Sequence, residues 1–385
     1  MSALAVVLLA VGLGGALLRP RNVPAWSLPL AAAVVAIGSG VVDGSQLHDV
    51  LRPLAAPLAF VLVAVPLAVS LDRVGVFGEL AALAARSRHV VGALWILAFL
   101  VVALLNLDAA VVLLTPLYIQ TALLIGVDPV GLAFQPVLLA SLASSVLVVS
   151  NLTNLIAAEK LSLHNADFLG HLALPSLVAS AVGWFAYRRV FPGRARVVAP
   201  TRPLDRRALV VGLGAIALFA VLLLAGEPFG VRAWTAALVT EVALIGVTRA
   251  VPWRQAPIGT VVLAGSLAVL AAGVAAELPD AFTSLGAGGV KGFAAAAASA
   301  NVLNNLPAVL VGLTHVSTPE RAWPLLLGMN IGPVLVLTGS LAGLLWQASA
   351  RQAGVDIAAR TYSRVGLMVG IPSMLAAVAV LRLLG

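Results

Sequence analysis

The sequence predicts an all-α polytopic membrane protein made of two inverted-topology repeats, and three observations predict it. Of the 385 residues, 61% are hydrophobic and 10% charged, with a mean hydropathy of +1.08. So much apolar surface cannot be hidden in a soluble core and must face lipid. Apolar runs of about 18–25 residues recur along the chain, each long enough to cross a bilayer. Polar segments interrupt these runs at matching places in the two halves of the chain.

Residues 1–187 form the predicted first repeat. The N-terminal run has no positive leader and no small-residue cleavage site, so we expect a retained span. Uninterrupted apolar runs predict spans at 2–18, 26–42, 53–71 and 168–187. Between the last two lie two interrupted regions, 89–125 broken at Asn106–Asp108 and 129–160 broken at Ser150–Asn154.

A basic linker at 188–207, rich in Arg, Pro and Gly, separates the halves, and residues 208–385 form the predicted second repeat. Uninterrupted runs there predict spans at 208–225, 233–250, 256–276 and 362–384. Two interrupted regions again precede the last span, 281–317 broken at Asn301–Pro307 and 322–348 broken at Asn330–Pro333. The order of elements therefore repeats.

Loop charges predict the orientation. If each first interrupted region is a re-entrant helical hairpin and each second one a broken crossing helix, the chain has about ten transmembrane helices, two hairpins and two broken helices. The basic clusters then all lie in the cytoplasm, including Arg19, Arg86, the linker, Arg249 and Arg351, with both termini outside. The alternative that regions 89–125 and 281–317 each cross the membrane twice stays open.

The polar breaks are the predicted substrate site. NLDAAVVLLT (106–115) and NLPAVLVGLT (305–314) are similar segments in the two halves. Irregular backbone at membrane depth persists only where it is buried in protein or lines a water-filled cavity, so we expect the four breaks to converge near the midplane. The alternative is that their amides and hydroxyls join helices by hydrogen bonds. The candidate substrate-binding residues are Asn106, Asn151, Thr153, Asn154, Asn304, Asn305, Asn330, Thr338 and Ser340.

Asp108 is the carboxylate that the pattern places in the membrane interior, where it must be paired, protonated or bound to a cation. It is the predicted ion-coupling residue, for protons or sodium. An alternative role is to cap the following half-helix.

The chain has no phosphate-binding loop, no HExxH, no GxSxG and no cysteine. We therefore predict a transporter rather than an enzyme, with no catalytic residue, metal site or cofactor. Because the basic residues lie mainly between apolar runs, we do not expect nucleic-acid binding.

Four segments resemble the ArsB-type arsenite efflux permeases of the ion transporter superfamily. They are NLDAAVVLLTP (106–116), SNLTNL (150–155), ANVLNNLPAVLVG (300–312) and NIGPVLVLTGSLAGLLW (330–346). The resemblance implies a multi-pass protein of the cytoplasmic (inner) membrane that exports arsenite or antimonite by proton antiport with alternating access. Its partners would be the metalloid, protons and the lipid bilayer.

Several alternatives remain beside this function. The chain could be a sodium/proton antiporter or another anion carrier of the same superfamily, or the membrane subunit of an ATP-driven arsenite pump with a cytoplasmic ATPase subunit. A homodimer also stays open.

Overall fold

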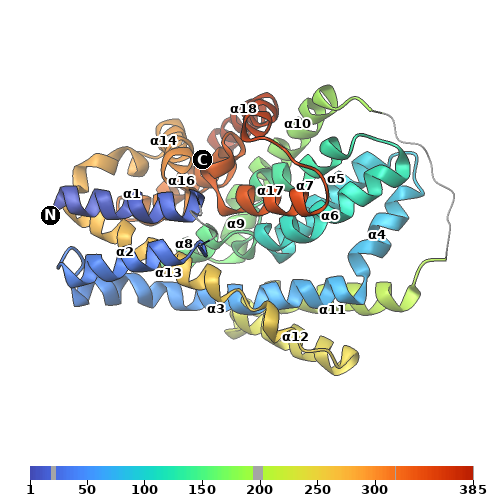
Figure 1. Cartoon of the computed structure of the whole chain (residues 1–385), viewed down its shortest axis with the longest axis horizontal. Coiled ribbons are helices and arrows are strands. Elements are labelled where there is room, and N and C mark those ends of the chain that lie inside the picture. Colours follow the sequence, from blue (N-terminus) through green and yellow to red (C-terminus); the bar gives the residue numbers. More distant parts are fainter. Residues whose placement is uncertain (19–22, 194–202, 317, 385) are drawn as a thin grey trace.

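The computed structural model describes residues 1–18, 23–193, 203–316 and 318–384, and every regular element in these ranges is helical (Figure 1). Arg19, Arg21 and the middle of the predicted linker lie outside the described residues. Six helical segments are long and apolar enough to cross a membrane: α3 (Gly44–Val74), α6 (Leu107–Ile125), α9 to α10 (Asn165–Val190), α11 (Arg206–Leu224), α13 (Ile258–Glu277) and α18 (Ala359–Leu384). The predicted all-helical membrane fold is confirmed.

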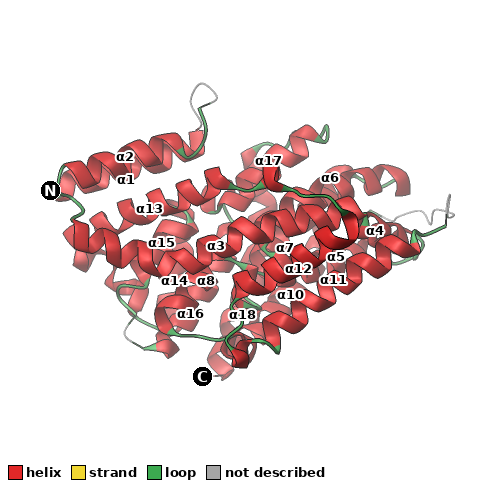
Figure 2. Ribbon diagram, turned by 90° about the horizontal axis from the view of Figure 1, so that it is seen from below, coloured by secondary structure: helices red, strands yellow, loops and turns green. Residues whose placement is uncertain are grey.

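Shorter apolar helices complete the framework. They are α1 (Ser2–Leu18), α2 (Ser27–Gly38), α4 (Val76–Ala85), α5 (Val90–Leu105), α7 (Pro129–Leu142) and α12 (Ala233–Thr248). A π-helical turn at Leu169–Ala173 joins α9 (Asn165–Phe168) to α10 (Leu174–Val190). Figure 2 shows α1 and α2 as a pair at one end of the molecule, while α11 and α12 lie along α3 in Figure 1.

Both regions predicted as hairpins turn at a single asparagine. Asn106 separates α5 from α6, and Asn304 separates α14 (Gly289–Leu303) from α15 (Asn305–Gly312). The eight residues of α15 rise about 12 Å, far less than the roughly 30 Å of the hydrocarbon layer. Region 281–317 is therefore a re-entrant hairpin and not two full crossings.

The two broken helices have longer breaks than the sequence predicted. In the first half, residues 143–151 separate α7 from α8 (Leu152–Leu161). In the second, residues 332–340 separate α16 (Pro319–Ile331) from α17 (Leu341–Gln352). Asn330 therefore lies inside α16 and not in the break, because the helix continues to Ile331, and only Gly332 separates it from Pro333, which cannot donate to the helical ladder.

The halves interlock at these elements. The return arm of each hairpin packs against the broken helix of the other half, α6 against α17 and α15 against α8. α10 packs along α18, and α14 packs along α16. Glycine allows the closest approach between the last pair, since a Cβ on Gly328 would lie 2.4 Å from the carbonyl oxygen of Phe293.

Candidate functional site

The two hairpin tips have the same local geometry. Asn106 and Asn304 both combine a positive φ, 114° and 71°, with an extended ψ, 144° and 149°, a strained backbone conformation found mainly in glycine. Each side-chain oxygen accepts the backbone N–H two residues later, from Asp108 at 2.9 Å and from Leu306 at 3.3 Å. Each asparagine thus caps the return helix of its own hairpin.

Each tip is also tied to the break of its own half. The Asn106 amide donates to the carbonyl oxygen of Val149 at 3.4 Å, and the Asn304 amide donates to that of Thr338 at 3.0 Å. Val149 lies two residues before Asn151, the N-cap of α8. In the same way, Thr338 lies two residues before Ser340, the N-cap of α17. The two halves are therefore equivalent at the level of single hydrogen bonds.

This equivalence shifts the alignment of the two hairpin tips by one residue. The similar segments had paired Asn106 with Asn305, but the structural counterpart of Asn106 is Asn304. Asp108 accordingly matches Leu306 and not Pro307. Two consecutive asparagines at the second tip left the register ambiguous, and the positive φ at Asn304 resolves it.

Four of the predicted binding residues bind one another. The side-chain oxygen of Asn330 accepts hydrogen bonds from the Asn151 amide at 2.8 Å and the Thr153 hydroxyl at 2.7 Å. Its nitrogen donates to the Asn154 oxygen at 2.7 Å and the Ser145 hydroxyl at 3.0 Å. Both donor hydrogens and both lone pairs of the Asn330 amide are therefore satisfied, all by first-half residues.

We call this cluster (Ser145, Asn151, Thr153, Asn154 and Asn330) the inter-repeat amide cluster. All five residues are buried. Asn154 also donates to two carbonyl oxygens of the first break, those of Ser144 at 2.8 Å and Leu147 at 3.0 Å. The cluster thus joins the two broken helices and supports the unwound backbone between α7 and α8.

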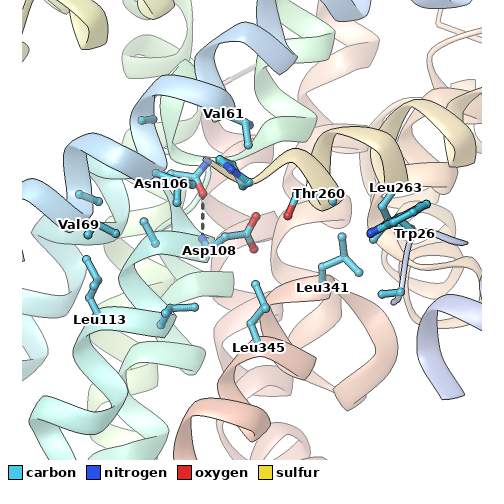
Figure 3. Close-up of a pocket in the computed structure, with 18 residues that line it drawn as sticks. Trp26, Val61, Val69, Asn106, Asp108, Leu113, Thr260, Leu263, Leu341 and Leu345 are labelled. Atoms are coloured by element: carbon cyan, nitrogen blue, oxygen red, sulfur yellow. Dashed lines mark hydrogen bonds between the residues drawn. The ribbon is translucent and has the colours of Figure 1, made fainter. Parts of the chain in front are cut away.

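A cavity of about 350 Å³ lies beside the first tip (Figure 3). Its walls come from α3 and α6 of the first half and from α13 and α17 of the second, with Ala25 and Trp26 completing the lining. Apart from the Trp26 indole, the polar side chains of the described lining are those of Asn106, Asp108 and Thr260. The remainder of the lining is apolar.

The Asp108 carboxylate is the charged group of this cavity. It is half-buried, and in the described chain it makes no hydrogen bond or ion pair, although Asn106 holds its backbone N–H. The carboxylate points toward the Thr260 hydroxyl on α13 (Figure 3). A desolvated, unpartnered carboxylate facing a cavity can accept a proton, a cation or a hydroxyl donor.

The remaining predicted residues lie outside this cavity. The Ser340 hydroxyl accepts the Gly343 N–H at 3.4 Å and caps α17, whose Leu341 lines the cavity. Asn305 is buried, and its side chain makes no hydrogen bond within the described chain, while Thr338 is half-buried. Of the predicted polar breaks, this cavity takes in the first tip, together with Leu341 directly after the second-half break.

Sequence reasoning missed Thr260 and Trp26. Thr260 lies in the first turn of α13, which the sequence presents as a plain apolar span. Gly259 makes room for the indole of Trp26, because a Cβ there would lie 2.8 Å from Trp26 Cδ1. One signal was available, since Thr260 and Ser266 bring hydroxyl groups into an apolar run.

The fold is shared with a known transporter. The YdaH transporter of Alcanivorax borkumensis, whose crystal structure was described as having an unusual topology, superposes with a TM-score of 0.58. The match covers 86% of this chain and 85% of that chain at 16% sequence identity.

Curated relatives confirm the resemblance to ArsB. An arsenical pump membrane protein of Yersinia enterocolitica is 27% identical, over 96% of this chain and 95% of its own length. One of Escherichia coli is 26% identical, over 93% of both. The family model described as citrate transporter (CitMHS) matches residues 1–332. This chain is a membrane transporter and belongs to the CitMHS citrate transporter family.

Proposed function

We propose that this protein exports arsenite or antimonite across the cytoplasmic membrane, as the neutral trihydroxide, in exchange for protons. The observation that carries the proposal is the cavity beside the first tip, in which Asp108 is the charged group of an otherwise apolar lining. The name of the relatives, arsenical pump membrane protein, supports the substrate class.

The cavity suits a small neutral hydroxide. Such a molecule presents O–H donors that the Asp108 carboxylate can accept and oxygen atoms to which the Thr260 hydroxyl can donate. The Asn106 side chain donates to the Val149 carbonyl oxygen and accepts the Asp108 backbone N–H. Its role is therefore to hold the Asp108 carboxylate in place. The chain has no cysteine that would trap the metalloid as a thiolate complex.

A polycarboxylate such as citrate fits this cavity poorly, although the family model is named after it. None of the described residues that line the cavity is Lys, Arg or His. A multiply charged anion would leave water without a compensating cation and would face the Asp108 carboxylate. The electrostatics of the cavity thus favour a neutral cargo.

Exchange follows if proton and cargo compete for one carboxylate. Ionised Asp108 accepts hydrogen bonds from the hydroxide, and protonated Asp108 offers no negative charge for that purpose. The empty, ionised carboxylate is costly to carry through a desolvated intermediate. An Asp108 carboxyl group that is protonated, or that accepts hydrogen bonds from the metalloid, is less costly to bury. The protein therefore changes conformation with either a proton or the metalloid bound.

The test measures arsenite accumulation in everted vesicles driven by a pH gradient, a sodium gradient, or ATP with a protonophore. We expect accumulation with the pH gradient alone. Sodium-driven transport without arsenite would support the antiporter alternative, and ATP-driven transport in the presence of the protonophore would support the pump subunit. Competition by citrate would support the anion carrier.

Asp108→Asn tests the coupling residue. We expect it to abolish accumulation driven by the pH gradient, because the amide can neither take up nor release a proton. Asp356→Asn is the control, since that carboxylate is exposed and pairs with Arg351 at 3.0 Å. Accumulation by Asp108→Asn at the rate of this control would refute the coupling role.

A further inference from the structure

A second cavity, far richer in positive charge, lies between the start of α5 and the end of α10. It has a volume of about 360 Å³, and Arg88, His89, Gly92, Trp184 and Arg188 contribute to its lining. The charge pattern places these helix ends on the cytoplasmic side, beside the predicted linker. Nothing in the proposed transport cycle uses this cavity, which we call the basic cavity.

Neither arginine of the basic cavity is neutralised within the described chain. Arg88 Nε donates to His89 Nε2 at 3.1 Å, and the Arg188 guanidinium donates to the carbonyl oxygens of Phe191 and Gly193 at 3.1 Å. All these acceptors are uncharged. Two guanidinium groups therefore share one cavity with no carboxylate among its described lining residues.

An acidic residue lies in the neighbourhood but serves another purpose. Asp128 lines an adjacent, smaller cavity together with Arg188. Its carboxylate accepts the Val130 N–H at 2.9 Å and caps the start of α7, and it forms no ion pair with Arg188. The positive charge of the basic cavity therefore remains available to an external anion.

Trp184 is the aromatic residue of the cavity lining, and it packs on a buried aromatic cluster. The guanidinium carbon of Arg188 lies 5.7 Å from the centre of the Trp184 ring, one helical turn earlier on α10. Trp184 in turn contacts Trp95 and Tyr187, with ring centres 5.7 and 6.0 Å apart. Tryptophan and tyrosine concentrate at the level of lipid headgroups, where one edge is wet and the other apolar.

An apolar stripe leads from the basic cavity along α5. Gly92, Ile96 and Leu100 are spaced by four residues and so lie on one face of the helix. Ile96 is 60% exposed and Leu100 48% exposed, so this apolar face is not covered by the rest of the chain. A molecule with an anionic head in the cavity could lay its acyl chains along these side chains.

We propose that the basic cavity binds the phosphate headgroup of an anionic phospholipid. Arg88 and Arg188 hold the phosphate, Trp184 lies at the level of the glycerol backbone, and the acyl chains run along Ile96 and Leu100. The site is also connected to the transport site, because the C-terminal end of α5 leads directly to Asn106 at the first hairpin tip. Bound lipid would anchor the hairpin that carries Asp108.

The test compares lipid binding to the purified full-length protein by native mass spectrometry and by the shift in melting temperature. Phosphatidylglycerol, phosphatidylethanolamine and inorganic phosphate are added separately. We expect phosphatidylglycerol to bind and to raise the melting temperature, with little effect from the other two. An equal shift with inorganic phosphate would identify a free-anion site and reject the lipid, and an equal shift with phosphatidylethanolamine would reject recognition of charge.

Variants locate the site. The double variant Arg88→Gln/Arg188→Gln should weaken phosphatidylglycerol binding roughly 25-fold, from the attraction expected of two arginines near an anionic surface. Arg351→Gln is the control, because that arginine already pairs with Asp356. Gly92→Leu is a second test that keeps the charge and fills the groove beside Trp184, and it should also weaken binding. Unchanged binding in both test variants would overturn the proposal.

Discussion

Replacing Asn330 with alanine separates two roles that its position allows. The sequence predicts that Asn330 binds substrate, whereas the structure shows its amide fully engaged with first-half residues across the inter-repeat amide cluster. If the amide fastens the halves together, Asn330→Ala should destabilise the fold. If it chiefly binds cargo, the variant should lose affinity at unchanged stability.

The expected loss follows from the bonds removed. Four hydrogen bonds disappear, and side-chain hydrogen bonds between membrane helices contribute about 0.6 kcal/mol each. The former partners remain buried, and groups left unsatisfied add to the cost. We therefore expect the free energy of unfolding to fall by about 2.5 to 4 kcal/mol.

Asn305→Ala is the matched control. Asn305 is also a buried asparagine of the second half, but its side chain makes no hydrogen bond within the described chain. Its removal should cost far less stability. Reversible unfolding in mixed micelles, followed by tryptophan fluorescence, measures both variants, and a loss in Asn330→Ala no greater than in Asn305→Ala would refute the argument.

Three further predictions concern single groups of the structure. Thr260→Val should raise the KM for arsenite several-fold at unchanged melting temperature, with recovery in Thr260→Ser; an unaltered KM would remove Thr260 from the site. Gly328→Ala should lower the melting temperature by forcing α14 from α16, whereas Gly265→Ala, with no atom within 4 Å of the added Cβ, should not. Trp346→Phe removes an indole hydrogen bond to the Ala133 carbonyl at 2.6 Å and should cost about 1 to 3 kcal/mol of unfolding free energy; unchanged stability would contradict it.

Much of the fold could be predicted from local chemistry. Apolar runs mark helices in lipid whatever their neighbours, and asparagine in a run marks a break because its side chain competes for backbone hydrogen bonds. Both tip asparagines, Asn106 and Asn304, behave in this way. The exact extent of the second break was not predictable, because Asn330 is compatible with a helix when its amide finds partners elsewhere.

The candidate site was predictable only in part. Asp108 stood out because a carboxylate in an apolar run is costly and therefore conspicuous. Thr260 did not, because a hydroxyl is common in membrane helices and the sequence does not show which face of α13 borders the first hairpin. Nor could the sequence distinguish an amide that binds cargo from one that binds another amide, as in Asn151 and Asn330.

The sequence by itself determined the membrane class, the polar breaks of the apolar runs and the carboxylate of Asp108 at the first break, because these depend on composition and on preferences within a few residues. Tertiary structure decided which polar groups satisfy each other and which remain free. The inter-repeat amide cluster joins residues about half a chain apart, while Asp108 lies in a cavity walled by both halves. Such pairing depends on how helices meet in space, and no local property of Asn330 or Thr260 encodes it.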